Sequence, residues 1–387
     1  MPWKQVNLQE QRIAFVIRAR VGGRRMSALC REFGISRDTG YRWLRRYEQA
    51  SSVMELCEVS RRPHHSPGQT AAEIEEKVVE LRQQYGWGAR KLITLLESRH
   101  HLQLKEWTAH RILRRRGLIE ARQSHRPALQ RFERAAPNEL WQMDGKGQYG
   151  VEQGWCYPLT ILDDHSRFAV GLYALPRWQS ARIWNCLLDS FARYGMPEAF
   201  LIDHGVPWWS NTNGHGLTQF AVALIEQGID LLYGRPYHPQ TRGKIERLHR
   251  TLDQAVRFKG RPNQFAAWGE LLEQFRTEYN HIRPHEALAM KPPATRYQPS
   301  PRQYAAHPRR WIYPQGAMVY RLNTQGCLDY QGHRWFVCEA LAGKEVRLEM
   351  VDQRILVSFR QLYVRELSQT QGRSHPLVLK APNNGGC

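Results

Sequence analysis

Residues 236–253 read PYHPQTRGKIERLHRTLD and contain the transition on which the fold prediction depends. Pro236 and Pro239 confine and then end a preceding strand, because proline cannot donate to a central β-ladder. After a loop at residues 240–243, apolar residues recur at steps of three and four, which predicts a helix with one buried face. That buried stripe consists of Ile245, Leu248, Leu252 and Val256.

Glu246 lies in the first turn of this predicted helix, beside the apolar stripe. A carboxylate near a helix start that also favours phosphate is well placed to hold a metal ion. From this stretch alone, a surface helix residue is the better interpretation of Glu246.

Two further acids change that interpretation. Asp144 follows ELWQM at the start of an apolar, glycine-interrupted strand pattern, and Asp203 ends the short apolar run AFLI. Such a run is typical of a buried parallel strand, and a carboxylate at its end faces the crevice where open α/β sheets bind ligands. Two strand-end aspartates and one helix glutamate suit a site for two Mg²⁺ or Mn²⁺ ions, which prefer oxygen ligands and leave positions open for phosphate.

Five motifs in this order resemble those of the DDE transposases related to retroviral integrases, most closely the IS481-like insertion-sequence group. The motifs are WQMDG at 141–145, ILDDHSRFAVG at 161–171, LIDHG at 201–205, RPYHPQTRGKIERLHRTL at 235–252 and YNHIRPHEAL at 279–288. The resemblance covers nearly the whole chain. It implies an RNase H-like core in which Asp144, Asp203 and Glu246 are the catalytic and metal-binding residues.

The chain departs from the family pattern after its second and third acids. His204 stands where the family usually has Asn, and the interval to the helix acid is longer, which a loop inserted at residues 208–218 would explain. Many relatives carry a basic residue seven positions after the Glu, where this chain has Asp253. We therefore expect Lys244 or Arg250 to contact DNA in its place.

Asp163 and Asp164 compete with these acids for a catalytic role. They are expected mid-sheet before Ser166-Arg167, where the resemblance implies a structural acid. We therefore do not assign them to the site.

The bulk composition indicates a polyanionic partner. The 387 residues carry a formal net charge of +20, which favours double-stranded DNA bound through counterion release. Seven scattered cysteines without a CxxC pair suit a reducing cytosol and argue against a disulfide scaffold or a zinc site. No apolar run is long enough for a membrane span, and the start lacks a secretory signal, so a cytoplasmic, nucleoid-associated bacterial protein is expected.

Residues 1–50 predict a helix-turn-helix DNA-binding domain, with helices at 8–20, 26–33 and 37–47. Ile13, Val16 and Ile17 are expected inside the first helix, Gly34 at the turn and Ser36 as the cap of the third. The outer face of the third helix offers the candidate DNA contacts Arg37, Thr39, Arg42, Arg45 and Arg46. The alternative is any short three-helix bundle with an exposed basic helix.

Residues 70–122 predict a second helix-turn-helix or winged-helix domain between basic linkers at 51–69 and 123–137. Its last helix carries the candidate DNA contacts Arg111, Arg114 and Arg115. The alternative is a cationic helix that packs on the catalytic domain.

The remaining chain predicts three parts. The RNase H-like mixed α/β core is expected at 138–295, a linker at 296–311, and a small SH3-like β-barrel at 312–368, where apolar and polar residues alternate. Residues 369–387 are expected to be a disordered tail. The fold class is therefore a multidomain α + α/β + β chain.

Together these features predict a transposase that binds the terminal inverted repeats of its element, then cleaves and transfers DNA strands with two divalent ions. Two element ends must react together, so a homodimer or higher oligomer is expected. The alternatives are a DNA-binding regulator with an inactive core and a structure-selective nuclease of the same fold.

Overall fold

The structure is a computed structural model that describes residues 8–50, 52, 56, 69–119, 133–210, 216–234, 243–368 and 372–380. The chain forms two compact units, residues 1–70 and 71–387. Several predicted features lie wholly or largely outside the described residues: the strand end near Pro236, the loop before residue 243, the middle of the inserted loop and most of both basic linkers.

The first unit is a three-helix module whose helices are α1 (Leu8–Val21), α2 (Met26–Glu32) and α3 (Arg37–Gln49). Its interior is formed by Phe15, Val16, Leu29, Cys30, Trp43 and Leu56. The Ser36 side chain accepts a hydrogen bond from the Thr39 amide and caps α3, as predicted. The prediction that Ile17 is buried is wrong: it is 47% exposed, because Phe15 and Val16 supply the buried face of α1.

A second three-helix module opens the second unit, with helices α4 (Ala72–Tyr85), α5 (Ala89–His100) and α6 (Glu106–Arg115). Its fully buried centre includes Val78, Leu92, Leu96 and Ala109. Gly86 ends α4 in a left-handed conformation, and this lets the chain turn sharply into α5.

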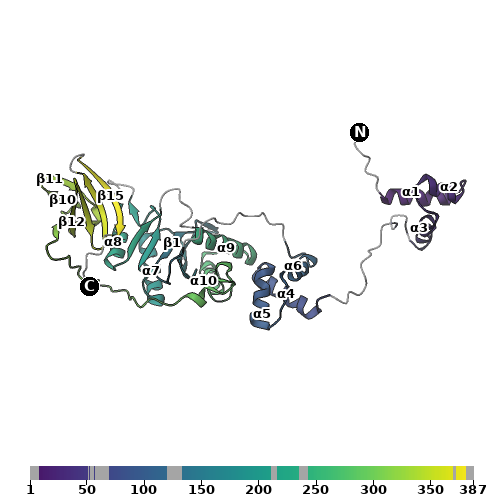
Figure 1. Ribbon diagram of the computed structural model, residues 1–387, viewed down its shortest axis with the longest axis horizontal. Coiled ribbons are helices and arrows are strands. Elements are labelled where there is room, and N and C mark those ends of the chain that lie inside the picture. Colours follow the sequence, from purple (N-terminus) through teal and green to yellow (C-terminus); the bar gives the residue numbers. More distant parts are fainter. Residues whose placement is uncertain are drawn as a thin grey trace. The chain divides into compact units, whose positions relative to one another are not determined.

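The core contains a six-stranded mixed sheet (Figure 1). Its strands are β1 (Trp141–Gly145), β2 (Tyr149–Val151), β3 (Gly154–Asp163), β4 (Ala169–Leu175), β5 (Ala199–Ile202) and β8 (Asp230–Tyr233). Strand β3 pairs antiparallel with β1, β2 and β4, whereas β1, β5 and β8 run parallel to one another in that order. This is the mixed sheet predicted for an RNase H-like core.

Helices pack on the sheet, and their apolar contacts with it form two separate clusters. The helices are α7 (Ser180–Tyr194), α8 (Gln219–Glu226), α9 (Gly243–Lys259) and α10 (Phe265–His281). One cluster joins α7 and α8 to Trp141 and Met143 of β1, and the other joins α9 and α10 to Leu162 and Leu172. The buried stripe predicted for α9 is confirmed.

The described chain also contains several short elements. They are β6 (Trp209–Ser210), β7 (Gly216–Leu217), η3 (Glu286–Leu288), η4 (Pro293–Arg296) and η5 (Glu339–Leu341). No helix in the described ranges is both long and apolar enough to cross a bilayer.

The C-terminal part is a small antiparallel β-domain, as predicted. The sheet order is β15-β14-β13-β12-β9, and β10 and β11 form a separate hairpin. The bounds are β9 (Met318–Arg321), β10 (Cys327–Tyr330), β11 (His333–Phe336), β12 (Glu345–Val351), β13 (Arg354–Phe359), β14 (Leu362–Ser368) and β15 (Arg373–Lys380).

The prediction of a disordered tail is wrong for residues 373–380, which form β15. This strand pairs antiparallel with β14, so its backbone groups satisfy an edge that would otherwise be open. Val378 packs against the main apolar cluster, and Lys380 Nζ lies 2.7 Å from Asp230 Oδ2 of β8.

The β-domain shares one apolar interior with the mixed-sheet core. A single cluster contains Phe220 and Leu224 of α8 together with Val346 and Leu367 of the β-domain. Figure 1 shows α8 beside the strands of this domain. The connection at 296–311 also packs on the core: the Ser300 amide donates to the Tyr194 carbonyl at 2.8 Å, and Met196 donates to Arg302 at 2.7 Å.

Candidate active site

Two of the predicted acids lie at the same end of two neighbouring strands. In the parallel pair β1–β5, Trp141 is in register with Phe200 and Gln142 with Leu201. Asp144 and Asp203 are separated by the same number of positions as these two pairs. Continuing the register therefore places them opposite each other at the carboxyl ends of adjacent parallel strands. This is the crevice position in which open α/β sheets bind ligands.

Local backbone groups hold both carboxylates. Asp144 Oδ1 accepts from the Gly145 amide at 2.9 Å. Asp203 Oδ1 accepts from the Gly205 amide at 3.0 Å and from the Trp208 indole nitrogen at 2.5 Å. Hydrogen bonds to ionised carboxylates are stronger than neutral ones, so these contacts orient the acids as well as solvating them.

The third acid, Glu246, is exposed in the first turn of α9. One turn further on, His249 Nε2 lies 2.7 Å from Thr160 Oγ1, and Thr160 donates to the Asp144 carbonyl at 2.9 Å. Three helical residues rise by roughly 4.5 Å, so Glu246 lies about one turn along α9 from the residue that contacts the β1–β3 pair.

The donor chemistry suits Mg²⁺, but the full ligand set is not assembled. Within the described residues, no group of three or more His, Cys, Asp or Glu side chains is arranged to hold a metal ion. Asp144 and Asp203 occupy matching positions on adjacent strands and supply carboxylate oxygens, the ligand type that hard cations prefer. The segment directly before α9 lies outside the described ranges, so the set of three remains a prediction.

Asp163 and Asp164 are both fully buried and tied to the backbone. Asp163 accepts from the amides of Ser166 at 2.7 Å and Asn138 at 2.8 Å, and burial raises its pKa. Asp164 accepts from Gln142 Nε2 at 2.8 Å. These contacts fit the structural role that the sequence suggested.

The two predicted DNA contacts on α9 differ in their surroundings. Lys244 Nζ lies 2.5 Å from Asp164 Oδ1, and burial lowers the pKa of this lysine. Arg250 is exposed. Asp253, at the unusual position, accepts from the Tyr149 hydroxyl at 2.7 Å and pairs with Lys146 at 3.0 Å, which links α9 to the β1–β2 turn.

The candidate contacts of the first module divide into two groups. Arg37, Arg42 and Arg45 are exposed on α3. By contrast, Thr39 Oγ1 lies 2.9 Å from Ser36 Oγ within the cap, and Arg46 lies over the Trp43 ring at 4.9 Å.

The second module shows the same division on α6. Arg111 lies over the exposed Trp107 ring at 4.3 Å, and Arg114 is exposed. Arg115 forms an ion pair with the buried carboxylate of Glu75 on α4. Arg115 therefore helps to hold the module together.

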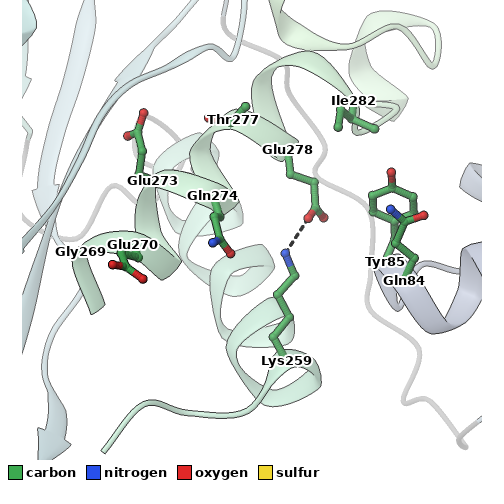
Figure 2. A pocket seen from close by; sticks show the side chains of 10 residues that line it. All are labelled: Gln84, Tyr85, Lys259, Gly269, Glu270, Glu273, Gln274, Thr277, Glu278 and Ile282. Carbon is green, nitrogen blue, oxygen red and sulfur yellow. Dashed lines mark hydrogen bonds and ion pairs between the residues drawn. The ribbon is translucent and has the colours of Figure 1, made fainter. Parts of the chain in front are cut away.

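The second module also contacts the core. Lys91 Nζ of α5 lies 3.0 Å from Glu286 Oε1, which follows α10. An open groove of about 730 Å³ lies between the end of α4, at Gln84 and Tyr85, and the helices α9 and α10. Figure 2 shows the side chains that line it. An ion pair between Lys259 and Glu278, 2.6 Å long, crosses its centre (Figure 2).

The sequence analysis missed two tryptophans beside the acids. Trp178 precedes α7, and Trp208 lies in the segment after Asp203. The consecutive tryptophans at 208 and 209, separated from LIDHG by two residues, were the available signal. The neighbouring His204 packs against the rings of Trp209 and Tyr233, whose centroids lie 4.9 and 5.1 Å from that of its imidazole.

Comparison with known protein families identifies the core and the helical modules. Residues 134–239 and 227–293 each match a family model described as an integrase core domain. Residues 11–52 match a helix-turn-helix domain, and residues 39–113 match a homeodomain-like domain. These matches support the resemblance to the DDE transposases and integrases. The IS481-like assignment within this family stays a prediction.

Two known proteins match parts of this chain. The transposase for transposon Tn552 of Staphylococcus aureus is 31% identical over 141 residues, covering 32% of this chain and 27% of the relative. The Gag-Pol polyprotein of avian reticuloendotheliosis virus is 26% identical over 144 residues, covering 37% of this chain and 12% of the relative. The chain thus spans well under two thirds of either relative.

Solved retroviral structures are also similar. A simian T-cell lymphotropic virus intasome in complex with PP2A regulatory subunit B56 gamma aligns over 80% of this chain and 100% of that chain, at 18% identity and a TM-score of 0.38. The HTLV-2 integrase catalytic core in complex with magnesium aligns over 42% of this chain and 97% of that chain, at 14% identity and a TM-score of 0.33. These scores establish no residue-by-residue correspondence.

Proposed function

We propose that this protein is a DNA transposase that binds the terminal inverted repeats of an insertion sequence and cleaves and transfers DNA strands there. The observation that carries the proposal is the common register of Asp144 and Asp203 at the carboxyl ends of β1 and β5. Transposition is the activity that the Tn552 relative's name states.

In this proposal Asp144, Asp203 and Glu246 hold two Mg²⁺ or Mn²⁺ ions. When bound, such ions activate the attacking hydroxyl and stabilise the leaving oxygen of an in-line displacement. The chain's own contribution is orientation: the Gly145 and Gly205 amides fix one oxygen of each aspartate. The Thr160–His249 contact holds α9, and with it Glu246, against the sheet.

The two helix-turn-helix modules supply DNA binding. Their exposed arginines at 37, 42, 45, 111 and 114 are the candidate contacts, with Arg250 beside the acids. A net charge of +20 supports a polyanionic partner. Because both element ends must be held while they react, the active form is a homodimer or a higher oligomer.

The test is cleavage of linear duplexes that carry the inverted repeats flanking the gene, in Mg²⁺ or Mn²⁺. Wild-type protein should nick at the repeat end, whereas Asp144→Asn, Asp203→Asn and Glu246→Gln should bind the duplex but lose at least about a hundredfold in nicking rate. Glu270→Gln is the matched control, because Glu270 is likewise an exposed glutamate on a core helix.

The same assay separates the alternatives. A regulator with an inactive core would bind the repeats and never nick them. A structure-selective nuclease would cut branched junctions whatever the end sequence. Retained nicking in any one of the three acid variants would refute the assignment of that residue.

A further inference from the structure

We propose that Trp208 is a positioning residue for Asp203, and that Trp178 holds Trp208 in place so that one indole pair sets the geometry of both strand-end carboxylates. The inference rests on the proposed function, since it concerns the same acids. It assigns a role to the segment that follows LIDHG.

The first step is the direct contact. The Trp208 indole N–H donates to Asp203 Oδ1 at 2.5 Å, and the side chain is only 1% exposed. The Gly205 amide donates to the same oxygen at 3.0 Å. Two donors on Oδ1 fix the plane of the carboxylate and therefore also the direction of Oδ2. Partners of this kind orient metal-ligating side chains and tune the affinity of the site.

The second step is the clamp on Trp208. Trp178 packs edge-to-face on Trp208, with ring centroids 6.0 Å apart and ring planes at 83°. Its own indole N–H donates to the Val206 carbonyl at 2.8 Å. Trp178 thus holds both the ring of Trp208 and the backbone two residues before it.

The third step connects the clamp to the other acid. The Trp178 ring lies so close to Gly145 that a Cβ added there would be 2.9 Å from it. Gly145 is the residue directly after Asp144 and donates to its carboxylate. A single indole therefore contacts the end of β1 and the loop after β5, and the absence of a side chain at Gly145 makes this approach possible.

The loop is also anchored from its other side. The Tyr233 hydroxyl donates to the Trp208 carbonyl at 2.9 Å, and the Thr218 hydroxyl donates to the Pro207 carbonyl at 2.6 Å. With its backbone held at both residues, Trp208 has little freedom to turn its N–H away from Asp203.

The test uses the full chain without DNA and measures Mn²⁺ binding by electron paramagnetic resonance. Trp208→Phe keeps an aromatic ring but removes the donor, and it should weaken Mn²⁺ binding by about tenfold, the low end of the usual effect of such partners. Trp209→Phe is the matched control, because Trp209 is the adjacent buried tryptophan and packs on His204 and Tyr233. It should change the affinity less than twofold.

Further variants keep the proposal falsifiable. Asp203→Asn should lose Mn²⁺ binding and therefore leave the sharp signal of free Mn²⁺ undiminished. Unchanged binding in this variant would place the ion elsewhere and overturn the proposal. Wild-type affinity in a folded Trp208→Phe, checked by circular dichroism, would also overturn it. If Trp208→Phe does not fold, Trp178→Phe replaces it and should weaken binding at least threefold; unchanged affinity would count against the clamp.

The outcome is distinct from that of the proposed function. A chain that binds Mn²⁺ through Asp203 and Trp208 but nicks no repeat would refute the transposase proposal and leave the positioning role intact. Conversely, normal nicking with unaltered Mn²⁺ dependence in Trp208→Phe would refute the positioning role alone.

Discussion

His249 Nε2 lies 2.7 Å from the hydroxyl oxygen of Thr160, and this contact joins the helix of the third acid to the strand beside the first. The Thr160 hydroxyl donates its only hydrogen to the Asp144 carbonyl. His249 must therefore donate from Nε2, which fixes the neutral tautomer with the hydrogen on that nitrogen. The imidazole is uncharged at neutral pH, because burial, with Lys146 nearby, lowers the pKa of His249 to about 4.

We predict a stability change with pH that depends on this histidine. Between about pH 6.5 and 4 the unfolded chain binds the proton at His249 and the folded chain does not, so the free energy of unfolding falls as the pH falls through this window. From pH 7 to pH 5 the loss from this residue should be about 2 kcal/mol. Urea unfolding of His249→Gln should show a smaller loss, whereas His110→Gln, an exposed change on α6, should match wild type.

The contact between the second helical module and the core makes a prediction at Gly86. This residue has φ +67°, and a Cβ there would lie 2.7 Å from the Phe258 ring of α9. Gly86→Ala should therefore cost about 1–3 kcal/mol of stability through backbone strain and displacement of the ring. Gly88→Ala, where no atom lies within 4 Å, should cost roughly 0.5 kcal/mol. Equal losses in both variants, measured by thermal unfolding, would argue against the contact.

The first module predicts a salt-dependent DNA contact at Arg42. Its side chain is exposed on α3, and removing one phosphate contact should lower the slope of log affinity against log salt by about 1. Titration of Arg42→Ala with a repeat-end duplex at several salt concentrations measures this slope. Arg18→Ala is the control, since Arg18 already pairs with Glu32 at 2.5 Å; an unchanged slope for Arg42→Ala would exclude the contact.

Lys244 should behave differently from Arg42. Its ammonium group lies against Asp164, a fully buried carboxylate that also accepts from Gln142. Removing the lysine leaves a buried charge without this partner, so Lys244→Ala should destabilise the core by about 2–4 kcal/mol. Chemical unfolding measures the loss, and stability close to wild type would show that the pair contributes little.

The elements that could be predicted from sequence are those set by local periodicity. The stripe Ile245–Leu248–Leu252 on α9 is buried, and Ser36 caps α3, because steps of three and four and a serine before a helix act over a few residues. The mixed-sheet core was predicted from the five motifs that resemble the transposase and integrase family. Asp144 and Asp203 occupy matching positions on neighbouring strands because β1 and β5 pair in register, and the sequence alone does not show this pairing.

Interactions between distant residues were not visible in the sequence. Trp178 and Trp208 meet only because β4 and the loop after β5 end on the same side of the sheet. Strand β15 has weak local signals and forms because β14 offers it an open edge. Arg115 and Lys244 looked like surface cations, yet each is paired with a buried acid 40 and 80 positions away in sequence.

The apolar interior that joins α8 to the C-terminal strands has a consequence for how this chain can be shortened or recombined. Truncation before residue 316 would expose Phe220 and Leu224 to solvent and leave an exposed apolar face on helix α8 of the core. The two parts should melt in a single transition, and a hybrid with another C-terminal domain would need a matching α8 surface. Chain order suggests interchangeable modules, but here the mixed-sheet core and its C-terminal neighbour must be inherited together.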